Sequence, residues 1–184
     1  TAKEPLYGIA FVILTSFVGT IAAILFGVPI ALLTAVFLVE VAPKKLAAVV
    51  KPAVELLAGI PSVIYGLLGI MILNPIMYQF ELAIFKDSTT HQFTGGSNLL
   101  SAVIVLTIMI LPTVVTMTES ALRAVPASMK AASLALGATK IQTVFRVLIP
   151  AAKSGIATAI VLGTGRAVGE AMAITLVAGS SVNA

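Results

Sequence analysis

Long apolar runs separated by short polar segments are the dominant pattern along the chain. Residues 6–39 carry no charge, and further apolar runs cover residues 56–80, 99–118 and 151–179. About 20 helical residues cross the hydrocarbon core of a bilayer, so each run is long enough for one crossing. The pattern therefore predicts an all-α, polytopic transmembrane helical bundle of about four spans.

Proline and glycine indicate where these helices are irregular. Residues 6–39 are too many for one upright span, which favours a long helix that is tilted, or bent near Gly27 and Pro29. The second run is interrupted at residues 59–61 and again at 74–75, each time by a proline. We expect both prolines to break that helix.

Charge is scarce and unevenly placed. Only 10% of the residues are charged and the mean hydropathy is +1.14, whereas a soluble domain has about 25% charged residues. This composition excludes an ordinary soluble protein, and a net charge of +4 fits loops beside membrane spans better than a nucleic-acid partner. Eight of the 11 basic residues lie in two connecting segments: Lys44, Lys45, Lys51, Arg123, Lys130, Lys140, Arg146 and Lys153. By the positive-inside rule these basic loops are cytoplasmic and both ends of the chain are extracytoplasmic.

The connection at residues 125–150 contains signals for two short helices. Pro126 suits a helix start and Gly137 a left-handed residue past a helix end, while Thr139 and Gln142 fit a capping box. We expect a fixed cytoplasmic elbow. The alternative is a loop that only joins two spans.

This segment resembles the cytoplasmic signature of permeases in binding-protein-dependent ABC importers. That signature reads Glu-Ala-Ala, three residues, Gly, nine residues, Ile-x-Leu-Pro, and the spacing is the same here, with Ala131 in place of the Glu. The resemblance implies a MetI-like permease core whose elbow couples to a separate ATPase subunit. The coupling residues would be Lys130, Ala131, Ala132, Ser133, Gly137, Val147, Ile149 and Pro150. The chain itself has no Gly-x4-Gly-Lys-Ser/Thr loop, so we expect no catalytic residue and no bound cofactor here, with ATP and Mg on the partner ATPase.

Besides Lys153 at its start, the last apolar run contains two charges, Arg166 and Glu170, four residues apart. A charge at mid-membrane costs about 2.5–3.5 kcal/mol, so the pair is expected to face other helices or a watery substrate pathway. The alternative is a buried pair that only fixes helix packing. Gly165 and Gly169 have the Gly-x3-Gly spacing of close helix contacts.

The sequences of residues 165–173 and 55–66 are similar to those of PstC, the C-type permease family of phosphate-specific importers. The resemblance covers nearly all of residues 1–184 but lacks the family's first and final spans, so we expect one transmembrane permease domain cut from a longer protein. It implies that Arg166 and Glu170 line the phosphate pathway. It also implies a cytoplasmic (inner) membrane location and three kinds of partner: two copies of the ATPase, a second permease subunit and an extracytoplasmic phosphate-binding protein.

Other functions stay open at the level of sequence. An importer of molybdate, sulfate or phosphonate would use a similar arginine, since a guanidinium does not by itself distinguish tetrahedral anions. From another class, an ion-coupled secondary transporter or a channel could use Arg166 and Glu170 as a gate. With no Cys and a lone His91, we expect no metal site.

Overall fold

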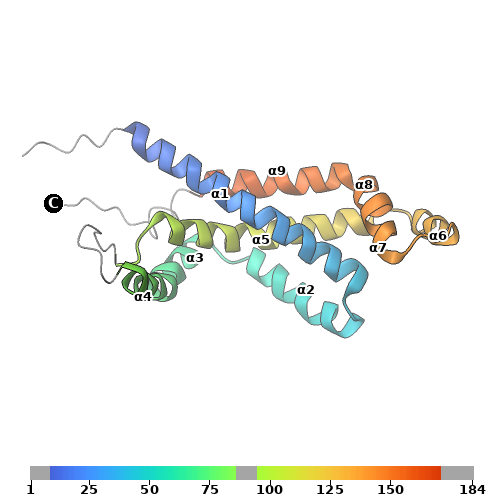
Figure 1. Cartoon of the computed structure of the whole chain (residues 1–184), viewed down its shortest axis with the longest axis horizontal. Coiled ribbons are helices and arrows are strands. Elements are labelled where there is room, and N and C mark those ends of the chain that lie inside the picture. Colours follow the sequence, from blue (N-terminus) through green and yellow to red (C-terminus); the bar gives the residue numbers. More distant parts are fainter. Residues whose placement is uncertain (1–8, 86–94, 171–184) are drawn as a thin grey trace, which may run out of the picture. The chain divides into compact units, whose positions relative to one another are not determined.

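The computed structural model describes residues 9–85 and 95–170, and this part of the chain is helical without strands (Figure 1). The all-α class is thereby confirmed. The elements in order are α1 (Ile9–Val36), the π-helical turn η1 (Phe37–Val41), α2 (Lys44–Ala58), α3 (Ser62–Leu68), η2 (Gly69–Leu73), α4 (Asn74–Phe85), α5 (Leu99–Arg123), α6 (Ala127–Ala135), α7 (Lys140–Thr143), η3 (Val144–Leu148), α8 (Ile149–Ala151) and α9 (Lys153–Gly169).

The described residues contain three to four candidate membrane spans, as predicted. Thr15–Val41, Ser62–Ile84 and Leu99–Arg123 are each long and apolar enough to cross a bilayer. The fourth candidate is a bent pair, in which Lys140–Ala151 and Lys153–Gly169 meet at 71°. The part of the predicted last span beyond Glu170 lies outside the described residues.

The expected proline breaks have different outcomes. At residues 59–61 the helix does end, and Pro61 takes the extended cap position before α3. At residues 74–75 the prediction was wrong, because η2 passes directly into α4. The first helix likewise stays helical through Gly27 and Pro29.

The π-helical turns lie just before prolines. All three of these turns end two residues before one, at Pro43, Pro75 and Pro150. A proline ring clashes with the carbonyl of the preceding turn and supplies no backbone N–H. A π turn is wider than an α turn and shifts the hydrogen-bond register by one residue, whereas Pro29, Pro52 and Pro112 lie inside α-helices.

The basic connecting segment after the first span is an amphipathic helix, which the sequence did not predict. It forms α2, which begins after Pro43 and contains no fully buried residue. Alanine, leucine, lysine and glutamate are strong helix formers, and they make up most of this segment. Val50 and Val54 pack against a neighbouring core.

The chain divides into two compact units. One contains the described residues of Thr1–Leu25, Pro61–Thr107 and Ala167–Ala184, and the other contains Phe26–Ile60 and Ile108–Arg166. We call the first the split unit and the second, which contains the elbow, the elbow unit.

In the split unit, a polar turn fixes the start of α5. Gly95 and Gly96 both have positive φ, 66° and 82°, and form a turn before α5, while residues 86–94 lie outside the described part. The Asn98 side chain accepts a hydrogen bond from the Ser101 backbone N–H at 2.9 Å, and the Ser101 hydroxyl donates to the Gly96 carbonyl at 2.6 Å. A Cβ on Gly96 would lie 1.9 Å from the Asn74 carbonyl oxygen, so only glycine fits.

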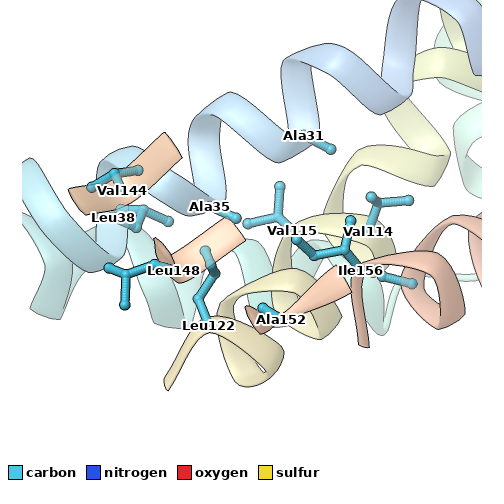
Figure 2. Packing of buried hydrophobic residues seen from close by; sticks show 11 residues of the cluster. Ala31, Ala35, Leu38, Val114, Val115, Leu122, Val144, Leu148, Ala152 and Ile156 are labelled. Carbon is cyan, nitrogen blue, oxygen red and sulfur yellow. The ribbon is translucent and has the colours of Figure 1, made fainter. Parts of the chain in front are cut away.

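The core of the elbow unit is built from small and branched aliphatic side chains (Figure 2). Its buried members are Ala31, Ala35, Leu38, Val114, Val115, Leu122, Val144, Leu148, Ala152, Ile156 and Ala159. Two glycines let α9 approach α5 closely within this unit. A Cβ on Gly155 would lie 2.5 Å from the Ala121 Cβ, and one on Gly163 would lie 2.4 Å from a Val114 methyl group.

Candidate functional site

The predicted elbow forms as two short helices joined at Gly137. Pro126 is the extended cap before α6, and Gly137 has a left-handed φ of 84°. The Gly137 N–H donates to the Leu134 carbonyl at 3.0 Å and the Ala138 N–H to the Ser133 carbonyl at 3.2 Å. This pair of bonds is the Schellman helix ending.

The second elbow helix starts with the predicted capping box. The Thr139 hydroxyl accepts from the Gln142 backbone N–H at 3.2 Å, and the Gln142 side chain accepts from the Thr139 N–H at 2.9 Å. Local hydrogen bonds therefore cap both helix ends at the bend. The segment is helical and capped, while its coupling role, against that of a connection that only joins two spans, stays a prediction.

One contact joins the two elbow helices and another fixes the elbow to the first span. The hydroxyls of Ser133 in α6 and Thr143 in α7 lie 2.9 Å apart. Lys130 forms an ion pair with Glu40 of η1, 90 residues earlier in the chain. Lys130 is thus engaged within the chain, at the end of the first span.

The elbow presents a mixed surface to solvent or to a partner. Of the predicted coupling residues, four are exposed and four are half-buried: Ala131, Ala132, Gly137 and Pro150 in the first group, and Lys130, Ser133, Val147 and Ile149 in the second. The sequence reasoning missed three large apolar side chains on the same elbow. Leu136, Ile141 and Phe145 are 89%, 71% and 57% exposed. The sequence could have indicated these side chains, because large apolar residues are unusual in a basic segment outside the apolar runs.

Arg166 lies in α9, and its guanidinium joins three helices of the elbow unit. Nη1 donates to the Thr113 hydroxyl of α5 at 3.0 Å and to the Ala58 carbonyl of α2 at 3.4 Å. The side chain is partly buried. An arginine inside a candidate span is thus held by neutral polar groups of neighbouring helices.

Glu170 lies immediately after the end of α9. Its backbone N–H donates to the Ala167 carbonyl at 3.4 Å, and the residue is half-buried. Because the described helix ends at Gly169, the expectation that Arg166 and Glu170 share one helical face stays a prediction. Gly165 and Gly169 are exposed, with open space where a Cβ would stand. Their role in helix packing likewise stays a prediction, since it would need a neighbour outside the described residues.

A second charged cluster, centred on Glu119, was not predicted from the sequence. The Glu119 side chain is only 4% exposed, and its Oε1 lies 3.3 Å from Lys51 Nζ and 2.8 Å from Arg123 Nε. The cluster joins α2 to α5. The i,i+4 spacing of Glu119 and Arg123 was its only local signal, since Lys51 is far away in sequence. Among the described residues, no group of three His, Asp or Glu side chains could hold a metal ion.

A helical bundle with three to four candidate membrane spans and a capped elbow is typical of membrane transport subunits. Residues 27–183 match the family "Binding-protein-dependent transport system inner membrane component". The chain belongs to this family. Membership favours an ABC importer permease over an ion-coupled secondary transporter or a channel.

Several curated relatives are similar over nearly the whole chain. The Bacillus subtilis "Probable ABC transporter permease protein YqgH" is 42% identical over 181 residues, which is 98% of this chain and 55% of that protein. The "Phosphate transport system permease protein PstC" of Xylella fastidiosa (strain Temecula1) is 36% identical over 98% of this chain and 56% of its own length. PstC of Mycobacterium leprae is 34% identical over 95% and 57%. The chain therefore spans just over half the length of these relatives.

Among solved structures, the chain is similar to one described as inward facing conformations of the MetNI methionine ABC transporter. The TM-score is 0.59 at 27% sequence identity, with 86% of this chain and 67% of that chain covered. The MetI-like permease fold is thereby confirmed.

Proposed function

We propose that this chain is part of a permease subunit that moves inorganic phosphate across the cytoplasmic membrane by ATP-driven alternating access. The observation that carries the proposal is Arg166, held by Thr113 and Ala58 inside a candidate span. A guanidinium offers a planar fork of N–H donors that matches the oxygens of phosphate. The PstC relatives support phosphate as the anion.

The proposed partners follow from what the chain lacks and what it exposes. It has no phosphate-binding Gly-x4-Gly-Lys-Ser/Thr loop of its own, so ATP and Mg would be bound by a separate ATPase, present in two copies. The elbow with Leu136, Ile141 and Phe145 is the surface we assign to that ATPase. A second permease subunit and an extracytoplasmic phosphate-binding protein would complete the importer.

We further propose that the elbow is cytoplasmic and that both ends of this chain are extracytoplasmic. The support is the distribution of basic residues, because positively charged loops stay on the cytoplasmic side. Arg166 and Glu170 would then lie along the route of the anion, with Glu170 keeping the empty site from trapping it.

The test is phosphate uptake by the complete importer reconstituted in vesicles. We expect Arg166→Gln to abolish vanadate-sensitive uptake of labelled phosphate while the ATPase still co-purifies. Arg166→Lys keeps the charge but loses the fork, so it should retain only partial uptake. Wild-type uptake by Arg166→Gln would overturn the proposal. Stronger competition by unlabelled sulfate or molybdate than by unlabelled phosphate would assign the importer to another oxyanion.

A further inference from the structure

The guanidinium of Arg166 is attached to the protein through one nitrogen. Nη1 carries two hydrogens, and its two acceptors are the Thr113 hydroxyl and the Ala58 carbonyl. Ala58 is the last residue of α2, and the next two N–H groups, of Gly59 and Ile60, bond to Leu56 and Leu57. The Ala58 carbonyl is therefore one of the helix-end acceptors that need a donor from elsewhere. The negative end of α2 also favours a cation at this point.

The remaining edge of the guanidinium has the geometry of an anion fork. With Nη1 engaged, Nε and Nη2 are the donors for which the described residues provide no hydrogen-bond acceptor. Their N–H groups are nearly parallel and can reach two oxygens of one tetrahedral anion. The partners of Nη1 thus decide which way this fork points.

Thr113 differs from three other hydroxyl-bearing residues of its helix. Thr107, Thr116 and Ser120 donate to their own backbone, to the carbonyl four residues earlier, at 2.7, 2.9 and 2.9 Å. This is the usual arrangement inside a helix. Thr113 instead accepts a charge-assisted bond from Arg166, 53 residues later in the chain. Such a bond fixes a long, flexible side chain that could otherwise adopt many rotamers.

We propose that Thr113 is a positioning residue of the anion pathway: with the Ala58 carbonyl it holds Nη1 of Arg166, so that Nε and Nη2 face the transported anion. The inference rests on the proposed function of Arg166 and adds the residue that aligns it. Thr113 acts through Arg166 and needs no contact with the anion. Small errors in the placement of such a group are costly, since a misplacement of about 1 Å can lower a rate by about 100-fold.

The test compares threonine variants in the complete importer with inorganic phosphate as the probe. Thr113→Val keeps the shape of the side chain and removes the acceptor. We expect about tenfold less phosphate transported per ATP hydrolysed, with normal subunit assembly and ATPase rate. Thr113→Ser restores the acceptor and should recover the ratio. Thr116→Val, three residues along the same helix, is the matched control and should behave as wild type.

Each outcome separates the two proposals. An unchanged transport ratio in Thr113→Val, while Arg166→Gln abolishes uptake, would overturn the positioning role and leave the proposed function standing. Full transport in both variants would overturn both. An equal loss in Thr113→Val, Thr113→Ser and Thr116→Val would indicate a packing effect of α5 and also overturn the positioning role.

Discussion

At the scale of single residues, Gly137 shows what the elbow requires of the backbone. Its φ of +84° is a conformation that side chains disfavour, yet a Cβ there would meet no other atom within 4 Å. The requirement is therefore conformational and not steric. An L-residue in the left-handed region costs about 1–2 kcal/mol, with asparagine tolerated best.

We therefore expect Gly137→Val to uncouple the importer and Gly137→Asn to be nearly normal. A β-branched residue at positive φ should displace α7 relative to α6, because the Schellman bonds of Gly137 and Ala138 depend on that angle. The measurement is phosphate uptake per ATP hydrolysed in vesicles. Equal coupling in the two variants would contradict this role for the backbone angle.

Glu119 is the second position where one residue decides a local structure. Its carboxylate is buried, whereas Lys51 and Arg123 are each about half exposed. Removal of the acid leaves two cations that can reach water. Removal of both cations leaves a buried charge without a counter-ion, which is far more costly.

This asymmetry predicts unequal losses of stability. We expect Glu119→Gln to lower the free energy of unfolding by about 1 kcal/mol, and the double variant Lys51→Met/Arg123→Met to lower it by about 3 kcal/mol. Thermal unfolding of the purified complex in detergent gives both values. Similar losses in the two proteins would show that Glu119 is not buried in the complex.

At the scale of elements, the contact between α9 and α5 depends on small residues on one face. Gly155, Ala159 and Gly163 recur every four residues, and Ala159 is fully buried. For Gly165 and Gly169, the glycine pair noted in the sequence, the described residues leave open space where a Cβ would stand. A four-residue spacing of small residues cannot by itself show which set meets a neighbour, because that depends on how α9 is rotated against α5.

We expect Gly155→Ala to destabilise the subunit and Gly165→Ala to be neutral or stabilising. The new Cβ at residue 155 overlaps Ala121, whose Cβ is fixed to the backbone of α5, and such overpacking costs about 1–3 kcal/mol. At residue 165 the space is free, and alanine favours a helix over glycine by about 1 kcal/mol. Thermal unfolding of both variants measures these changes in stability. A destabilised Gly165→Ala would reveal a neighbour on that face.

The elements that the sequence predicted correctly are those fixed by local chemistry. The contacts of Pro126, Gly137 and the Thr139–Gln142 box involve residues close in sequence, so the sequence of the elbow was enough to predict it. The partners of Arg166 could not, because Ala58 and Thr113 lie 108 and 53 residues away. The helix α2 was missed for a related reason: its apolar face gains stability only from a core that the local sequence does not reveal.

At the scale of the whole molecule, burial differs among the described candidate spans. In the 18-residue apolar window of each span, 61% of the Leu99–Arg123 window is buried, against 28% for Thr15–Val41 and 22% for Ser62–Ile84. Lipid accounts for exposed apolar side chains in spans. If the basic elbow is cytoplasmic, as proposed, its exposed apolar side chains would not face lipid. Exposed apolar residues there indicate a protein partner.

We therefore expect Ile141→Asp to prevent capture of the ATPase. Ile141 is 71% exposed in the first turn of α7, where an acidic residue suits the helix N-terminus, so the elbow itself should survive. Loss of a buried isoleucine from an interface costs about 1.5–3 kcal/mol, which corresponds to about 10- to 100-fold weaker binding. Co-purification of the ATPase with the tagged permease measures the effect.

The matched control is Val49→Asp, because Val49 is equally exposed at 71% but lies on α2, outside the elbow. It should retain the ATPase, and both variants should reach the membrane at normal levels. If Val49→Asp lost the ATPase while Ile141→Asp kept it, the docking surface would lie on α2. If both kept it, exposed apolar residues of the elbow would not contribute to docking, and the assignment of the elbow surface would fall.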